Sequence, residues 1–206
     1  MKNTVTVKRK SSETVITVKI NKGELAPDYR KQIKTPLPFL NHMIEHIAWR
    51  AGLNISIDMD FDEFELNHLV CEDVGMTFGK AVGEFVRLNT PSGYGTGGGM
   101  IDEAYADTAI SFEDRSLFNF RTAVEYAETV ENMPSEELLT FLDGFAQGAR
   151  CTLYVDLKCG ENGHHIWEAI YRGVGIALGQ ALSIDPNREG KTSGVAGKVE
   201  YEISAE

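Results

Sequence analysis

The chain has 206 residues, of which 42% are hydrophobic and 25% are charged, a balance that is typical of a folded globular protein and excludes a largely disordered one. This length suffices for one sizeable domain or two small fused ones. The formal net charge of −11 argues against a nucleic-acid partner and against an anionic membrane, because both would repel the chain.

Hydrophobic periodicity in the first half predicts two strands, a helix, a strand and a second helix. Apolar residues at positions 40, 43, 44 and 47 form a helical stripe that follows Pro36 and Pro38 and ends near Gly52. The expected elements are a hairpin over residues 4–20, a polar loop over 21–35, a helix over 39–51, a strand over 53–59 and a long helix over about 70–88.

The second half begins with a glycine-rich segment over residues 89–99, which we interpret as a flexible loop. It superficially resembles a phosphate-binding loop but lacks the Lys-Ser/Thr pair of a P-loop. The other expected elements are paired strands over 101–112 and 115–124, a helix over 135–148, a strand over 151–157, a helix over 164–182 and a polar tail over 185–206 with a short strand at 199–203.

The order strand-strand-helix-strand-helix therefore occurs twice, which predicts an internal duplication with half-repeats at residues 1–90 and 91–206. Local sequence supports the repeat, because Phe39-Leu40-Asn41-His42 and Phe141-Leu142-Asp143-Gly144 precede similar strands. Such a pattern buries its apolar faces when two sheets flank the helices. We expect one compact α+β unit with two mixed sheets on either side of a helical layer.

The cysteines and the apolar segments indicate the cellular compartment of the protein. Cys71, Cys151 and Cys159 are odd in number and form no Cys-x-x-Cys pair, so we expect neither a disulfide framework nor a thiolate zinc site. No apolar run reaches the roughly 18 to 20 residues that a membrane-spanning helix needs, and the first residues lack the apolar core of a signal peptide. We therefore expect a cytoplasmic protein without a membrane partner.

Histidine and carboxylate side chains recur at one spacing, which indicates a metal site. His164 and Glu168 are four residues apart and share one face of the last helix, whereas His165 points about 100° away and could serve a second ion. His68 and Glu72 repeat this spacing at the start of the other long helix. Imidazole with carboxylate suits manganese, zinc or iron. Each histidine taken alone is also compatible with a surface or capping role, and the sequence contains no His-Glu-x-x-His motif of zinc proteases.

Three motifs resemble those of the imidazoleglycerol-phosphate dehydratase family, in the family's order and over nearly the whole chain. They are Phe39-Leu40-Asn41-His42-Met43-Ile44, His68-Leu69-Val70-Cys71-Glu72-Asp73-Val74-Gly75 and Gly160-Glu161-Asn162-Gly163-His164-His165-Ile166-Trp167-Glu168-Ala169. Shorter segments around Glu13, Asp102 and Arg115 resemble the family as well.

The resemblance implies a hydro-lyase that dehydrates imidazole glycerol phosphate to imidazoleacetol phosphate in histidine biosynthesis. It implies a fold of the ribosomal protein S5 domain 2-like type, a divalent metal cofactor, expected to be Mn²⁺, and a large cubic homo-oligomer built from trimers with sites at the subunit interfaces. The implied metal ligands are His42, His68, Glu72, His164, His165 and Glu168. The implied catalytic residues are Glu13, Glu72 and Glu168, and the implied substrate contacts are Glu13, Arg115, Arg172 and Lys198.

The chain departs from the family pattern at positions that belong to the expected site. Leu69 and Tyr154 stand where the family has imidazole ligands, and Asn41 replaces an aspartate beside the first ligand. His46, where the family has glutamine, and Tyr154, as a phenolate, are both open as replacement ligands. Two alternatives therefore stay open: a divergent member that acts on another substrate, and a non-catalytic member that keeps the assembly and part of the metal site.

Overall fold

The computed structural model describes residues 2–61, 65–188, 190–197, 199–200 and 202–204. The substrate contact expected at Lys198 lies outside the described residues. The helices are α1 (Pro38–Ala51), α2 (Asn67–Asn89), α3 (Ser135–Ala149) and α4 (Gly163–Ala181), with short 3-10 turns η1 (Tyr29–Gln32) and η2 (Pro186–Arg188). Within the described part of the chain, none of these helices is both long and apolar enough to span a membrane.

The strands form two main sheets and a small hairpin. The first sheet has the order β1 (Thr4–Lys10), β2 (Thr14–Asn21), β3 (Asn54–Phe61), and its strand pairs are antiparallel. The second has the order β4 (Tyr94–Ile101), β5 (Ala104–Ser111), β9 (Thr152–Cys159), β6 (Leu117–Thr122), with β6 and β9 parallel. The hairpin joins β7 (Thr129–Val130) to β8 (Met133–Pro134).

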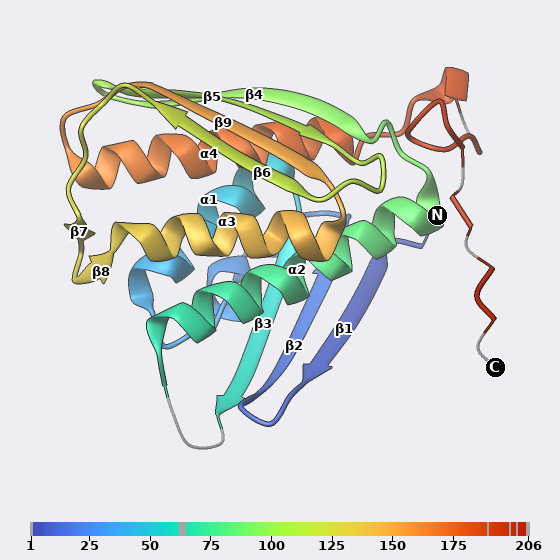
Figure 1. Cartoon of the computed structure of the whole chain (residues 1–206), viewed down its shortest axis with the longest axis horizontal. Helices are drawn as coiled ribbons and strands as arrows, with labels where there is room; N and C mark the ends of the chain where they lie inside the picture. Colours follow the sequence, from blue (N-terminus) through green and yellow to red (C-terminus); the bar gives the residue numbers. More distant parts are fainter. Residues whose placement is uncertain (1, 62–64, 189, 198, 201, 205–206) are drawn as a thin grey trace.

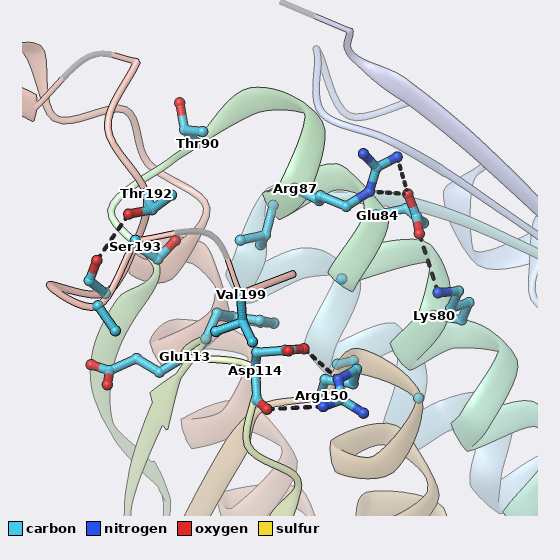
Figure 2. A pocket seen from close by; sticks show the side chains of 18 residues that line it. Lys80, Glu84, Arg87, Thr90, Glu113, Asp114, Arg150, Thr192, Ser193 and Val199 are labelled. Atoms are coloured by element: carbon cyan, nitrogen blue, oxygen red, sulfur yellow. Dashed lines mark hydrogen bonds and ion pairs between the residues drawn. The ribbon is translucent and has the colours of Figure 1, made fainter. Parts of the chain in front are cut away.

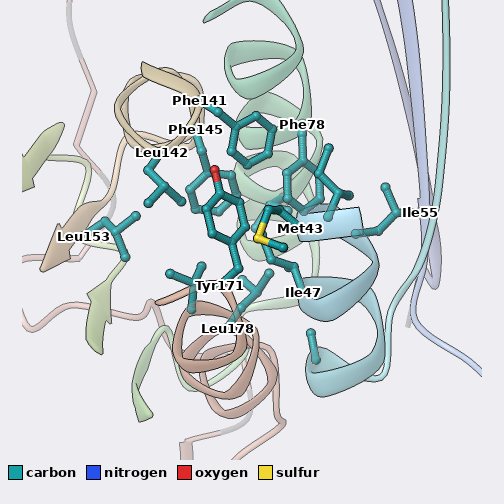
Figure 3. Close-up of a cluster of buried hydrophobic side chains, with 14 of the residues drawn as sticks. Met43, Ile47, Ile55, Phe78, Phe141, Leu142, Phe145, Leu153, Tyr171 and Leu178 are labelled. Atoms are coloured by element: carbon teal, nitrogen blue, oxygen red, sulfur yellow. The ribbon is translucent and has the colours of Figure 1, made fainter. Parts of the chain in front are cut away.

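The helices form a layer between the two sheets, as Figure 1 shows, so the expected α+β arrangement of two sheets flanking helices is confirmed. Alternating burial along the strands sends one apolar face of each sheet toward this layer. In the core of Figure 3, side chains from all four helices meet around the fully buried Tyr171. The Tyr171 hydroxyl donates to the Leu138 carbonyl (2.8 Å), so the phenol is buried without losing its hydrogen bond.

The packed helices run parallel, so all four begin at the same end of the layer, which we call the histidine end. In each pair of contacting helices, a residue later in one helix contacts a residue later in the other. The contacts are Ile47 with Gly175 and Ala51 with Gly179 for α1 and α4, Phe141 with Gly75 and Ala149 with Gly83 for α3 and α2, and Ser135 with Trp167 and Leu138 with Tyr171 for α3 and α4. Four of the five histidines lie in the first two turns of α1, α2 and α4, and His46 lies one turn after His42. The parallel packing therefore brings them to one end of the molecule.

The interpretation of residues 89–99 as a flexible loop is wrong over most of that segment, which forms the edge strand β4. Gly95, Gly97 and Gly99 face α4, and the two backbones are in contact. An added Cβ at Gly97 would lie 2.4 Å from the Gly173 carbonyl oxygen, and one at Gly99 would lie 1.9 Å from the Ala169 carbonyl oxygen. The glycines are therefore required because strand and helix approach too closely for any side chain.

Two further expectations about strands are wrong. The segments 101–112 and 115–124 contain β5 and β6, but these strands do not pair with each other, because β9 lies between them in the sheet. Hydrophobic alternation identifies strands and does not reveal their neighbours, so an insertion from later in the chain is invisible to it. The described residues within 199–203 form no strand. The expected boundary between the half-repeats 1–90 and 91–206 falls in the connection from α2 to β4, and the duplication stays a prediction.

Substituting Gly97→Ala should destabilise the protein by roughly 2–3 kcal/mol, because the new methyl group must push β4 away from the backbone of α4. The matched control is Gly98→Ala on the opposite face of the same strand, where the added Cβ meets only the end of the Tyr105 side chain. Urea unfolding followed by circular dichroism measures both variants. Equal stability of the two would contradict the close packing of β4 on α4.

Candidate metal centre

Two adjacent imidazoles lie in the first turn of α4 because the helix is capped immediately before it. The Asn162 side chain accepts hydrogen bonds from the backbone N–H groups of His164 (2.9 Å) and His165 (3.4 Å). The two rings are nearly perpendicular, with an interplanar angle of 87°. They therefore face different neighbours, as the helical spacing predicts.

His164 belongs to what we call the imidazole cluster, which consists of His42 and His46 from α1 and His164 and Glu168 from α4. The ligand atoms of His42, His164 and Glu168 lie within 4.8 Å of one another. Glu168 Oε2 is 3.4 Å from His164 Nε2 and 4.0 Å from His42 Nε2. Glu168 Oε1 is 3.2 Å from His46 Nε2, which lies 3.4 Å from His42 Nε2. Nitrogen and oxygen donors at these separations suit a divalent cation such as manganese, zinc or iron.

The carboxylate at the centre of this cluster is buried, since Glu168 is only 5% exposed. A buried carboxylate requires compensating charge or hydrogen bonds. The Arg172 guanidinium, one turn further along α4, pairs with Glu168 Oε1 and donates to the Met100 carbonyl (2.8 Å). Arg172 Nε is buried and has no hydrogen-bond partner among the described residues. Glu168 is therefore held between one guanidinium and three imidazoles.

His46 is suited to bind a cation because burial disfavours its protonated form. Desolvation lowers the pKa of His46 to about 4, against the opposing effect of the nearby Glu168 carboxylate. At neutral pH the ring is therefore neutral and keeps one nitrogen lone pair. A neutral imidazole is the form that binds metal.

A carboxylate faces Nδ1 of each of the four histidines that we predicted from the sequence as metal ligands. The pairs are His42 with Glu45 (3.4 Å), His68 with Glu137 (3.2 Å), His164 with Glu131 (3.1 Å) and His165 with Glu103 (2.8 Å). A carboxylate only accepts, so it holds the hydrogen on Nδ1 and leaves Nε2 as the donor to a cation. Such carboxylate–histidine pairs are typical of metal sites, where they orient the ligand rings.

His165 lies outside the imidazole cluster, in a second acidic group with Asp102 and Glu103 of the β4–β5 turn. Glu103 accepts hydrogen bonds from the backbone N–H groups of Asn162 (2.8 Å) and Glu161 (3.1 Å) as well as from His165. These hydrogen bonds lower the pKa of Glu103 to about 2. The same hydrogen bond with Glu103 raises the pKa of His165 above its ordinary value. Glu103 therefore fixes both the start of α4 and the ring of His165.

A cavity of about 480 Å³ opens beside the imidazole cluster, a volume that suits a small ligand. Its lining joins the segment before α1 and the β7–β8 turn to two imidazoles: Leu37, Pro38, Phe39, His42, Glu131, Asn132, Met133 and His164. Glu131 and Asn132 both have positive φ (48° and 61°), which is the geometry of a tight hairpin turn. This turn brings Glu131 over His164.

The two predicted ligands on α2, His68 and Glu72, do not belong to the imidazole cluster of the same chain. Among the described residues, neither His68 nor Glu72 joins a group of three potential ligands. The His68 side chain is 64% exposed and contacts Glu137 at the start of α3. The expectation that His68 with Glu72 and His164 with Glu168 form halves of one site is therefore not met inside a single chain.

The predicted substrate contacts are also dispersed. Arg172 lies beside the imidazole cluster, where it pairs with Glu168. Glu13 is exposed in the β1–β2 turn. The hydroxyl of the next residue, Thr14, donates a hydrogen bond to Asp73 of α2 (2.7 Å). Arg115 lies at the opposite end from the histidines, where the Thr152 hydroxyl at the start of β9 donates to its carbonyl (3.4 Å). The hydroxyl of Tyr154 on β9, the other residue open as a replacement ligand, accepts a hydrogen bond from Arg121 (2.9 Å).

A second cavity, of about 390 Å³, lies at the end where α2 and α3 finish, beneath the C-terminal tail (Figure 2). Its described cations are paired with carboxylates of the same lining. Lys80 and Arg87 both contact Glu84, and Arg150 contacts Asp114. Because the charges of this lining neutralise one another, we place the candidate site at the histidine end.

The sequence did not reveal the four carboxylates that face the imidazoles. Glu45 carried the only local signal, because it lies three residues after His42 on the same helix face. Glu103 and Glu131 reach the imidazoles from hairpin turns, and Glu137 does so from another helix. These contacts depend on tertiary packing and follow no sequence spacing.

The fold and the cluster define a class: an α+β protein with two sheets around a layer of parallel helices, and histidine–carboxylate groups of the kind that bind a divalent cation. The family model described as imidazoleglycerol-phosphate dehydratase matches residues 35–178, which is more than half of the chain. The chain belongs to the imidazoleglycerol-phosphate dehydratase family.

Individual relatives agree with this assignment. The imidazoleglycerol-phosphate dehydratase of Methylobacterium radiotolerans is 30% identical over 203 residues, covering 94% of this chain and 97% of the relative. That of Caldivirga maquilingensis is 31% identical over 191 residues, covering 89% and 94%. The crystal structure of the enzyme from Staphylococcus aureus matches with a TM-score of 0.74 and 26% identity over 88% of this chain and 99% of that one. IGPD from Pyrococcus furiosus, in complex with (S)-C348, matches with a TM-score of 0.76 and 27% identity over 94% and 100%.

Replacing Glu131→Ala should weaken the binding of Zn²⁺ or Mn²⁺ about 10-fold, because His164 loses the acceptor that orients its ring. Glu131→Gln should retain most of the affinity, since the amide oxygen can still accept from Nδ1. Titration calorimetry of the metal-free protein measures both, with exposed Glu128→Ala as the control. Unchanged affinity in Glu131→Ala would show that this contact does not support a metal ligand.

Proposed function

We propose that this chain is a metal-dependent hydro-lyase that dehydrates imidazole glycerol phosphate to imidazoleacetol phosphate, a step of histidine biosynthesis. The observation that carries the proposal is the imidazole cluster, in which His42, His164 and Glu168 present their ligand atoms within 4.8 Å of one another in a member of the dehydratase family. The substrate is a small imidazole phosphate, and the adjoining cavity of about 480 Å³ has room for a molecule of that size.

We propose Mn²⁺ as the cation, held by His42, His164 and Glu168 in this chain, with His68, Glu72 and His165 as further ligands. The residues fit a divalent ion: the donors are imidazole nitrogens and a carboxylate, and carboxylates face Nδ1 of the proposed histidine ligands. When bound, the cation would stabilise negative charge that develops on the substrate's ring.

Dehydration removes a proton from one carbon and hydroxide from its neighbour, and the resulting enol becomes the ketone. Carboxylates can carry the proton in each direction. We propose that Glu13, Glu72 and Glu168 carry out these proton transfers. Glu168 is buried among the imidazoles, whereas Glu13 is exposed at a turn and is free to approach a substrate from the side.

The phosphate requires cationic partners, and we propose Arg115, Arg172 and Lys198, with Glu13 as a further substrate contact. Arg172 supports this role because its Nε is buried without a partner among the described residues. A guanidinium matches the geometry of a phosphate group. Lys198 lies outside the described residues.

The dispersed positions of these residues support an assembly in which subunits share sites. The 15 residues of α3 span about 22 Å, and this helix separates the histidine end from the end that carries Arg115. One chain cannot bring Arg115 to its own imidazole cluster, but a second chain can. We therefore propose a large cubic homo-oligomer built from trimers, with sites at the subunit interfaces. The three free cysteines support a cytoplasmic location.

The purified protein supplied with Mn²⁺ should form imidazoleacetol phosphate from imidazole glycerol phosphate, and removal of the metal by a chelator should stop turnover until Mn²⁺ is restored. Glu168→Gln should lower kcat at least about 100-fold, because it removes a ligand and a proton carrier together. Glu24→Gln, in an exposed loop, is the matched control. Absence of turnover with metal bound would contradict the proposed reaction and favour a member that acts on another substrate.

A further inference from the structure

We propose that His46 is itself a metal ligand, so that a cation between α1 and α4 would take His42, His46 and Glu168 of a single chain as donors. The inference rests on the metal dependence proposed above and adds a residue to the expected ligand set. Helix α1 would then supply two ligands, four residues apart on one face, and α4 would supply the Glu168 carboxylate.

The separation of the two imidazoles of α1 matches that of two ligands on one cation. His46 Nε2 lies 3.4 Å from His42 Nε2. Two nitrogens bound tetrahedrally at about 2.0–2.1 Å from zinc lie about 3.3–3.4 Å apart. The two rings are steeply inclined to each other, at 67°, with centroids 4.6 Å apart, so they meet at their nitrogens and do not stack.

The carboxylate of Glu168 joins the ligands of the two helices. Its Oε1 is 3.2 Å from His46 Nε2, and its Oε2 is 3.4 Å from His164 Nε2. The backbone holds this arrangement in place, because Gly175 of α4 allows α1 to approach so closely that an added Cβ would lie 3.1 Å from the His46 carbonyl oxygen. Only 17% of the His46 side chain is exposed. The His46 ring is therefore largely enclosed between α1 and α4.

His46 Nε2 faces two atoms that can each donate a lone pair to a cation. Glu45 faces His42 Nδ1, which leaves a lone pair on His42 Nε2. The two atoms that face His46 Nε2 are His42 Nε2, at 3.4 Å, and Glu168 Oε1, at 3.2 Å. A cation among them would accept a lone pair from each.

Titration calorimetry of the metal-free full-length protein with Zn²⁺, and separately with Mn²⁺, tests the assignment. His46→Gln should weaken binding at least about 100-fold, more than the loss of an orienting contact would. Arg50→Gln, exposed one turn further along α1, should change the affinity less than 2-fold by the same reasoning. Zinc X-ray absorption should count one nitrogen fewer in His46→Gln. Unchanged affinity with an unchanged nitrogen count would overturn the proposal.

A measurement on the unaltered protein covers the case in which His46→Gln does not fold. In the zinc-loaded wild type, the ¹⁵N chemical shift of His46 Nε2 should be that of a metal-bound nitrogen. A shift typical of a ring outside the metal's coordination would overturn the assignment. If His46 binds metal but no dehydration occurs, the proposed function fails and this inference stands. If turnover occurs while His46 stays unbound, the reverse holds.

Discussion

The histidine end depends on the burial of one carboxylate. Glu168 is 5% exposed and lies where α1 and α4 pack together, a position in which an isolated charge would be very costly. Three imidazoles and the Arg172 guanidinium surround it. The packing of α1 against α4 therefore buries the Glu168 carboxylate, and the surrounding imidazoles and guanidinium compensate its charge.

Parallel packing of the helices explains why this arrangement occurs at one end of the molecule. Helix N-termini carry partial positive charge, which favours the carboxylates that gather there. Glu45, Glu103, Glu131 and Glu137 each face an imidazole at this end. At the opposite end the cations and carboxylates of the described cavity neutralise one another. A chain with a net charge of −11 thus concentrates its cation-binding capacity where its helices begin.

The sequence predicted the helices and the recurring histidine–carboxylate spacing, because both follow from periodicity within one helix. It did not predict β4, whose glycines are set by contact with α4 and produce no apolar alternation. It did not predict that β9 separates β5 from β6, since strand order depends on long-range packing. For the same reason His46 could only be named as an open replacement ligand, and its contacts with His42 and Glu168 became visible in the fold.

The central claim is that a divalent cation binds between α1 and α4 at Glu168. Crystals of the protein grown with Mn²⁺, with diffraction data collected at an energy where manganese scatters anomalously, test it most directly. We expect an anomalous peak within bonding distance of Glu168 and the Nε2 atoms of His42 and His164. A structure with manganese bound elsewhere, and with Glu168 still paired only to Arg172 and imidazoles, would contradict the claim.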